Sequence, residues 1–171
     1  MKKESGCKIA IKKLQTHFNA KDLLTEAILL NNCDHFNLIK IEGVCFKNNK
    51  IDSIIMEYMN SGDLLTYLRE SKVNTLDQAV HIATQISLGC EYLESNKMIH
   101  RDLAARNCLL NINENNNLTV KIADFGLAKE LTSTDDDYYR LLETTNKCLP
   151  IRWMAPESIT FGKYSTKSDV W

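Results

Sequence analysis

The period of the apolar pattern changes once along this chain, and that change limits what the chain can fold into. Up to about residue 58, short runs alternate polar and apolar residues as half-buried strands do, with one helical stretch at 19–32. From Asp63 the spacing becomes helical, and Thr75-Leu76-Asp77-Gln78 forms a capping box that opens a long amphipathic helix. The sequence therefore predicts an α+β fold with a β-rich first part and a mainly helical second part.

Turn formers divide the remaining pattern. The stretch at 59–62 ends the β-rich part, and the Asn-rich stretch at 112–117 is typical of a hairpin turn. Residues 129–149 are polar, and we expect a mobile loop there. The predicted strands lie at 8–12, 41–45, 51–58, 108–110 and 120–123.

Composition and charge exclude several classes of protein. The 171 residues are 44% hydrophobic, but apolar runs extend over only a few positions, whereas a membrane-spanning helix needs about 20. Because 21 basic residues face 22 acidic ones, no overall positive field exists to attract a nucleic acid, and we expect no nucleic-acid partner. The six cysteines form no C-x-x-C pair, so we expect reduced, mostly buried thiols rather than a zinc site or a disulfide scaffold.

Four separated strings contain the polar residues that chemistry requires. They are Ile9-Ala10-Ile11-Lys12, the stretch His100-Arg101-Asp102-Leu103-Ala104-Ala105-Arg106-Asn107, Asp124-Phe125-Gly126 and Ala155-Pro156-Glu157. Each residue alone has an ordinary explanation, since a lysine after a strand is usually a surface amine and Asp or Asn in a loop commonly forms an Asx turn. Together, and in this order, the strings resemble a protein kinase.

The resemblance implies a role for each polar residue. Lys12 corresponds to the lysine that holds the α- and β-phosphates of ATP, and Glu26 to the glutamate that pairs with it. Asp102 corresponds to the catalytic aspartate, which accepts the proton of the substrate hydroxyl and orients its oxygen. Asn107 and Asp124 correspond to the side chains that hold Mg²⁺ through oxygen. His100 and Phe125 resemble members of a hydrophobic stack that maintains this arrangement.

The resemblance also implies a slot for the adenine ring between two lobes. Ala10 is expected above the ring and Leu109 below it. Backbone groups near Glu57 and Met59 are expected to hydrogen-bond its edge. We therefore expect ATP and Mg²⁺ as cofactors.

The motif around Asp102 indicates which hydroxyl is phosphorylated. Its cation, Arg106, comes four residues after the aspartate, whereas serine and threonine kinases typically place a lysine two residues after it. This resembles a tyrosine kinase, and the Ala-Ala-Arg order resembles the receptor type, similar to the insulin-receptor, Ros-like and leukocyte tyrosine kinase groups. The string Pro150–Glu157 resembles the substrate shelf of tyrosine kinases, which supports a tyrosine reaching toward Asp102.

Paired tyrosines in the predicted loop suggest regulation. Tyr138 and Tyr139 resemble the activation-loop tyrosines of receptor kinases, and a phosphate on them would pair with Arg101 and nearby cations. Their ordinary explanation is two exposed aromatic residues on a loop. The expected partners are protein substrates that carry tyrosine and a second receptor copy for phosphorylation in trans.

The match to a kinase domain is partial at both ends. No G-x-G-x-x-G precedes Lys12, and residues 168–171 resemble only the beginning of the central helix of the large lobe. We expect an incomplete two-lobed kinase fold that is weakly stable and weakly active or inactive alone, because apolar faces would lack their partners. Its expected parts are a small lobe at 1–58, a hinge at 59–62 and the front of the large lobe at 63–171, with an activation loop at about 124–157.

An alternative function and a location remain as expectations. The alternative is a pseudokinase-like module that binds partners without catalysis, although the five polar catalytic residues argue against it because a scaffold does not need them. No secretory signal peptide follows the charged N-terminus, so we expect a cytoplasmic chain, at the inner face of the plasma membrane if it belongs to a receptor.

Overall fold

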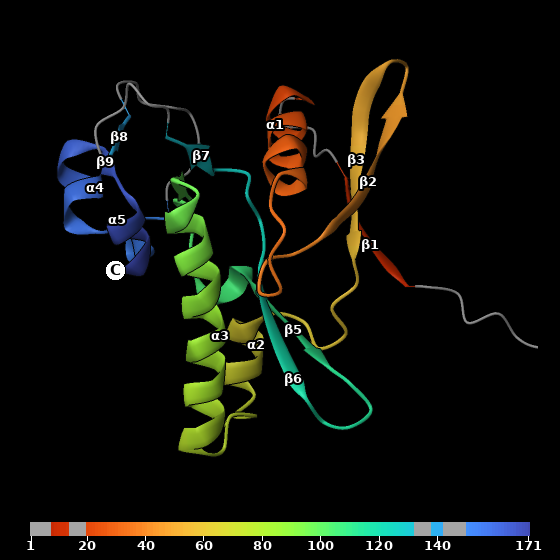
Figure 1. The fold of residues 1–171 in the computed structure, drawn as a ribbon, viewed down its shortest axis with the longest axis vertical. Coiled ribbons are helices and arrows are strands. Elements are labelled where there is room, and N and C mark those ends of the chain that lie inside the picture. Colours follow the sequence, from red (N-terminus) through yellow and green to blue (C-terminus); the bar gives the residue numbers. More distant parts are fainter. Residues whose placement is uncertain (1–7, 14–19, 132–137, 142–149) are drawn as a thin grey trace, which may run out of the picture.

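The computed structural model describes residues 8–13, 20–131, 138–141 and 150–171, and predictions about the other residues lie outside it. Its elements form a β-rich part and a mainly helical part (Figure 1). The α+β fold class predicted from the apolar pattern is therefore confirmed. The lobe and hinge boundaries stay predictions.

The β-rich part is a three-stranded antiparallel sheet with one helix packed on it. Its strands are β1 (Ile9–Lys13), β2 (Ile41–Lys47) and β3 (Lys50–Glu57), in the order β1–β3–β2. Helix α1 (Ala20–Asn31) lies against this sheet, where Leu23 and Ala27 form a buried cluster with Ile51 and Ile54.

Strand β1 presents its polar residue to the interior side. Ala10 and Lys12 are half-buried, whereas Ile9 and Ile11 are exposed. Side chains alternate between the two faces of a strand, so Ala10 and Lys12 share one face. Lys12 contacts α1, which identifies this face as the one toward the helix.

The helical part is organised around α3 (Leu76–Ser95), which packs along the hairpin of β5 (Cys108–Ile112) and β6 (Leu118–Ile122). Helix α2 (Leu64–Arg69) lies beside this hairpin (Figure 1). The remaining elements are short: β4 (Met98–Ile99), β7 (Lys129–Glu130), β8 (Tyr139–Arg140), α4 (Pro156–Phe161), β9 (Lys163–Tyr164) and α5 (Thr166–Val170).

Helix α3 begins where the capping box predicts. The Thr75 hydroxyl accepts a hydrogen bond from Gln78 N at 3.2 Å, while Gln78 Oε1 accepts one from Asn74 N at 2.9 Å. The predicted apolar face is only partly right, because Gln85 and Gly89 are buried whereas Ala79 and Ala83 are exposed. The helix therefore faces β6 along a line that includes a polar residue and a glycine.

We expected a mobile loop over residues 129–149, and the part of this range that the structure describes contains two short strands. Strand β7 pairs with β4, and β8 pairs with β9. Both pairings are only two residues long and join segments distant in sequence. The local alternation of polar and apolar residues therefore could not predict them. The residues between β7 and β8, at 132–137, lie outside the described ranges.

Two compositional expectations can also be compared with the structure. Within the described ranges, no helix is both long and apolar enough to cross a bilayer. The described cysteines are all free thiols, as predicted, but the expectation that most are buried is wrong. Cys108 is buried, Cys33 and Cys90 are half-buried and Cys45 is exposed.

Candidate active site

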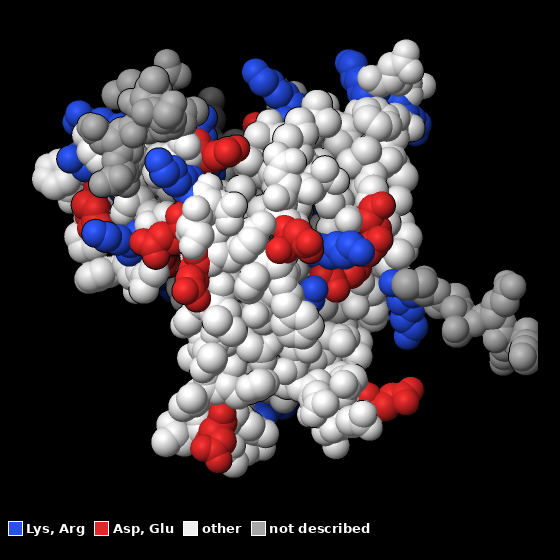
Figure 2. Space-filling model, in the orientation of Figure 1, with Lys and Arg blue, Asp and Glu red and all other residues white. Residues whose placement is uncertain are grey.

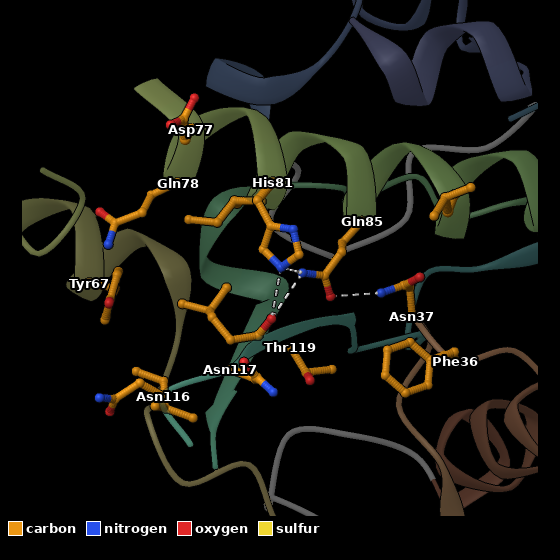
Figure 3. A pocket seen from close by; sticks show the side chains of 14 residues that line it. Phe36, Asn37, Tyr67, Asp77, Gln78, His81, Gln85, Asn116, Asn117 and Thr119 are labelled. Carbon is orange, nitrogen blue, oxygen red and sulfur yellow. Dashed lines mark hydrogen bonds between the residues drawn. The ribbon is translucent and has the colours of Figure 1, made fainter. Parts of the chain in front are cut away.

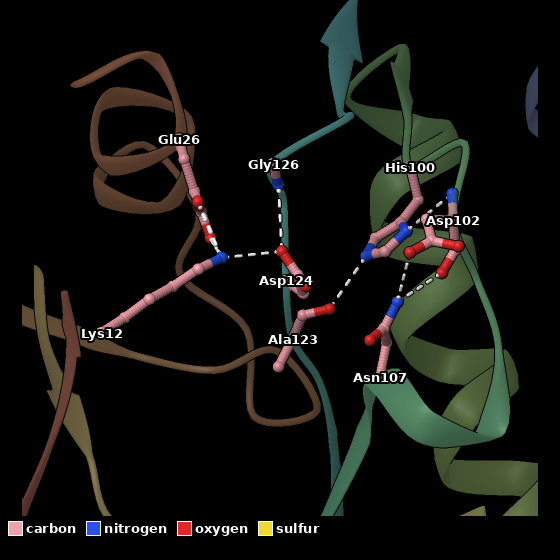
Figure 4. Close-up of polar contacts among 8 residues, drawn as sticks. All are labelled: Lys12, Glu26, His100, Asp102, Asn107, Ala123, Asp124 and Gly126. Carbon is pink, nitrogen blue, oxygen red and sulfur yellow. Dashed lines mark hydrogen bonds and ion pairs between the residues drawn. The ribbon is translucent and has the colours of Figure 1, made fainter. Parts of the chain in front are cut away.

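The ammonium group of Lys12 joins three segments of the chain. Lys12 Nζ lies 2.6 Å from Oε1 and 2.9 Å from Oε2 of Glu26 on α1, and 2.7 Å from Oδ1 of Asp124 (Figure 4). Glu26 is 3% exposed, so its carboxylate is held away from solvent. The sequence placed these three residues in one site, and the structure brings them into direct contact.

Burial and charge act against each other in this cluster. Burial lowers the pKa of Lys12, but the nearby Glu26 and Asp124 carboxylates outweigh it and the pKa is raised. Burial raises the pKa of Glu26 although Lys12 opposes this. For Asp124, burial is outweighed by Lys12 and by hydrogen bonds from Lys12 and Gly126, and its pKa is lowered. Asp124 is therefore held as an anion beside an ammonium.

A second cluster forms around Asp102. Arg106 Nη2 donates to Asp102 Oδ1. Asn107 Nδ2 donates to Asp102 Oδ2 and to its backbone oxygen, both at 2.8 Å (Figure 4). Burial raises the pKa of Asp102, although the hydrogen bond from Asn107 and the charge of Arg106 oppose the rise. Asn107 uses its amide nitrogen in these contacts, so its side-chain oxygen Oδ1 points away from Asp102.

Backbone contacts join the two clusters. Ala123 N donates to Asn107 O at 2.8 Å. The Ala123 oxygen lies 3.1 Å from His100 Nε2 (Figure 4). Asp124 follows directly with φ of 64°, a left-handed conformation that a non-glycine residue adopts only at a cost. The chain turns there, and this turn aims the Asp124 side chain at Lys12.

His100 and Phe125 form the packed support beneath this turn. Their rings lie 4.9 Å apart in an edge-to-face arrangement, and both side chains are buried. Burial lowers the pKa of His100 to about 4, so the imidazole is neutral at pH 7. Phe125 shares its buried cluster with Leu30 of α1, which links the turn to the helix that carries Glu26.

Sequence reasoning missed Asp169, which binds the backbone of the two residues before Asp102. Its Oδ2 accepts from His100 N at 2.6 Å and its Oδ1 accepts from Arg101 N at 2.8 Å. Burial raises the pKa of Asp169 to about 6 against the effect of these two donors. From the sequence, Ser168-Asp169-Val170-Trp171 indicated only the start of a helix. The carboxylate of Asp169, next to the buried Ser168 of that helix, is the feature that could have indicated a buried hydrogen-bond acceptor.

A pocket of about 560 Å³ opens beside Asp102 and Arg106. Its other wall is the segment Pro150–Trp153, and Arg106 Cζ lies 5.8 Å from the centre of the Trp153 ring. A phenol ring needs far less volume than this. The pocket can therefore admit an aromatic side chain with its hydroxyl toward the Asp102 carboxylate.

The residues expected around the adenine ring come from both parts of the fold. Ala10 lies in β1 opposite Met56, and Leu109 lies in β5 opposite Lys121. Glu57 Oε1 accepts from Lys121 Nζ and from Lys40 N, each at 2.7 Å, so the Glu57 carboxylate already has two donors. Met59 is buried in the main core.

The approach of Ala10 and Leu109 to one adenine ring stays a prediction. The ion pair between Lys121 of β6 and Glu57 of β3 joins the two parts of the fold. Basic and acidic side chains are interspersed on the face that Figure 2 shows.

Both loop tyrosines have cations next to their rings. Arg101 Cζ lies 5.0 Å and Lys129 Nζ 5.7 Å from the ring centre of Tyr139. Lys163 Nζ lies 4.3 Å from that of Tyr138. Tyr139 is paired with Tyr164 through the β8–β9 ladder. The sequence had linked Tyr139 to Arg101, and the structure places these two side chains together.

The oxygen atoms of Asn107 and Asp124 suit a magnesium ion. Mg²⁺ prefers oxygen ligands and is usually held by one or two carboxylates together with substrate phosphates and water. Among the described residues, no group of three or more His, Cys, Asp or Glu side chains could form a cage for a metal by itself. A two-residue site completed by phosphate oxygens fits this donor set.

Comparison with known proteins agrees with this geometry. Residues 1–171 match the family model described as protein tyrosine and serine/threonine kinase. The chain is 43% identical over 175 residues to the proto-oncogene tyrosine-protein kinase ROS of Homo sapiens, covering 96% of this chain and 7% of that protein. It is 44% identical over 172 residues to the tyrosine-protein kinase Abl of Drosophila melanogaster, covering 99% and 10%.

Protein sevenless of Drosophila melanogaster is 39% identical over 183 residues, covering 98% of this chain and 7% of that protein. The chain thus spans about a tenth or less of the length of these relatives. The family match extends over every motif from which the kinase resemblance was predicted. The chain belongs to the protein tyrosine and serine/threonine kinase family.

Proposed function

We propose that the protein carrying this chain transfers the γ-phosphate of ATP to tyrosine hydroxyl groups of protein substrates. The observation that supports this most strongly is the convergence of two polar clusters, Lys12 with Glu26 and Asp124, and Asp102 with Asn107. A backbone bond from Ala123 N to Asn107 O connects them. Two of the relatives above are named as tyrosine-protein kinases, which supports tyrosine as the acceptor.

In this proposal Lys12 binds the α- and β-phosphates, and Glu26 and Asp124 hold its ammonium in place. The oxygen atoms of Asn107 and Asp124 would hold Mg²⁺, which neutralises phosphate charge when bound. Electrostatic stabilisation of this kind is the main demand of phosphoryl transfer, because the protein has little covalent chemistry to perform.

Asp102 acts on the acceptor. The tyrosine enters the pocket beside Asp102 and Arg106, and the Asp102 carboxylate accepts the proton of its hydroxyl as the phenol oxygen bonds to the γ-phosphorus. The bond between the γ-phosphorus and its bridging oxygen breaks, and ADP leaves. Because burial raises the pKa of Asp102, the carboxylate is a stronger base than an exposed aspartate.

Receptor signalling and regulation belong to the same proposal. The Ala104-Ala105-Arg106 order supports a receptor kinase, with this chain on the cytoplasmic side of the plasma membrane and a second receptor copy as partner. Phosphorylation of Tyr138 and Tyr139 would be the regulatory step, supported by the cations beside their rings.

The test is a phosphotransfer assay on the complete protein that carries this chain, with a tyrosine-containing peptide and labelled Mg-ATP. We expect phosphotyrosine, and we expect Asp102→Asn to lower turnover by about 10²- to 10⁴-fold while ATP still binds. Phosphoserine as the product would refute tyrosine specificity. ATP binding or partner binding without transfer, unchanged by Asp102→Asn, would support the pseudokinase alternative.

A further inference from the structure

Side chains hydrogen-bond much of the outer edge of strand β6, where no third strand runs in the part of the chain that the structure describes. The hairpin sheet contains β5 and β6, and the other edge of β6 meets the backbone around Leu38 in an isolated bridge at Ile122. Gln85 Oε1 accepts from Val120 N at 2.8 Å, and Gln85 Nε2 donates to Leu118 O at 3.1 Å. Asn37 Nδ2 donates to Val120 O at 2.9 Å. Two carboxamides thus bond the edge groups of Leu118 and Val120.

Gln85 is the centre of this arrangement (Figure 3). Its oxygen also accepts from Asn37 Nδ2 at 3.1 Å, and its amide lies 2.8 Å from His81 Nε2. The Gln85 side chain is 7% exposed, in a buried row of α3 otherwise formed by Ile82, Gly89 and Leu93. An apolar residue there would fill the same space, so burial alone does not account for a glutamine.

The bonds continue along β6 toward the candidate active site. Asn37 O accepts from Ile122 N at 2.8 Å, and Ile39 N donates to Ile122 O at 2.9 Å. The segment between α1 and β2 thereby continues the row of partners that Gln85 begins. The next residue, Ala123, is bonded to Asn107, and Asp124 follows.

Helix α3 also approaches β6 too closely for an ordinary side chain at one point. A Cβ atom at Gly89 would lie 2.8 Å from Ile122 Cδ1 and 3.2 Å from Asn37 O. Gly89 lies one helical turn after Gln85, on the same buried row. Close backbone approach and the Gln85 bonds therefore fix β6 against α3 at two successive turns.

We propose that Gln85 is a positioning residue for Asp124. Gln85 holds Val120 and Asn37 together and so sets the position of β6 along α3. The position of β6 in turn sets where the chain turns at Asp124. The proposal rests on the proposed kinase function for its catalytic consequence. Gln85 touches neither the expected nucleotide nor the reacting atoms, so its effect passes through β6.

The experiment compares Gln85→Met, which keeps the volume and loses the hydrogen bonds, with the parent in the complete protein. We expect faster hydrogen exchange over residues 118–126, a roughly tenfold higher half-saturating Mg²⁺ concentration and a roughly tenfold lower kcat, with KM for the peptide unchanged. Ser87→Ala is the matched control, because Ser87 is exposed and its Oγ donates within α3, to Ala83 O, and it should change none of these.

A second variant keeps the proposal testable if Gln85→Met does not fold. Gln85→Glu retains an acceptor for Val120 N and Asn37 Nδ2 and loses only the donor to Leu118 O, so exchange at 120–126 and the Mg²⁺ requirement should stay near those of the parent. A lower melting temperature with unchanged exchange and Mg²⁺ requirement in Gln85→Met would overturn the proposal. A raised Mg²⁺ requirement in Gln85→Glu despite protected amides would do the same.

Failure of the proposed function gives a different result. A parent protein that binds Mg-ADP but transfers no phosphate would refute the kinase proposal. The positioning proposal would then stand or fall on exchange and on Mg-ADP affinity in the Gln85 variants.

Discussion

Lys12 and Asp124 lie 112 positions apart in the chain, yet Lys12 Nζ donates to Asp124 Oδ1 at 2.7 Å. The bond connects the β-rich part to the turn that follows β6. Because Glu26 binds the same ammonium, α1 is included in the connection. The Lys12 ammonium thus joins strand β1, helix α1 and the turn at Asp124.

Replacing Lys12 by methionine should reduce both activity and stability. The change removes the group proposed to hold the phosphates, and a charge-assisted contact of this kind corresponds to about 100-fold in kcat/KM. It also leaves Glu26 buried without its cation, which should lower the free energy of unfolding by about 1–3 kcal/mol. Lys13→Met, one residue along β1 and exposed, is the control for both assays. Equal melting and turnover in the two variants would contradict the role of Lys12.

Replacing Glu26 by glutamine should raise the Mg²⁺ requirement. Without the carboxylate of Glu26, the Lys12 ammonium is drawn more strongly to Asp124, which is also the proposed magnesium ligand. We expect the half-saturating Mg²⁺ concentration to rise by about tenfold in a phosphotransfer titration. Glu42→Gln, which removes an exposed carboxylate 3.6 Å from Lys40, should leave the titration unchanged. A Mg²⁺ curve that does not shift in Glu26→Gln would argue that Lys12 and the metal do not compete.

Replacing Tyr138 and Tyr139 by phenylalanine should abolish activation by prior incubation with Mg-ATP. A phosphate on Tyr139 would add about two negative charges beside Arg101 and Lys129, and it would order the loop around them. We expect incubation to raise turnover of the parent about tenfold and that of the double variant little. Mass spectrometry checks the modified positions. Tyr67→Phe on α2 should be activated like the parent; a fully activated double variant would refute the switch.

Buried His100 and half-buried Asp169 should make opposite contributions to the free energy of unfolding as the pH falls. As pH falls from 6.5 to 4, the unfolded chain binds a proton at His100 that the folded chain does not bind, because the folded pKa is about 4, and stability falls. Asp169 has a folded pKa of about 6 against an ordinary value of 3.8. It therefore binds its proton in the folded state first, and stability rises. Each contribution amounts to about 3 kcal/mol, so the two largely offset each other.

Asp169→Asn should remove one side of that balance. The unfolding free energy of this variant should fall more steeply than that of the parent between pH 6.5 and 4, as measured by urea titration at each pH. The comparison variant is His100→Asn, whose stability should rise over the same interval. Parallel curves for parent and Asp169→Asn would show that the Asp169 proton does not contribute.

The burial pattern of α3 shows how far local reasoning extends. The cap at Thr75 and the helical period followed from residues close together in sequence, and both were right. The buried Gln85 was missed because its partners, Val120 and Asn37, lie 35 and 48 positions away. Helical periodicity predicts that apolar residues are buried and polar residues are exposed. A glutamine that is buried because it forms hydrogen bonds is therefore predicted to be exposed.

The sequence by itself determined the kinase family, the α+β class and the polar residues in the kinase-like motifs. These depend on short strings and on local periodicity. Only the tertiary structure decided that Lys12 binds Glu26 and Asp124 together, that β8 pairs with β9 and that Asp169 supports the backbone of His100. Each of these is a contact between distant segments. Its geometry depends on how whole elements pack, and no single stretch of sequence contains that information.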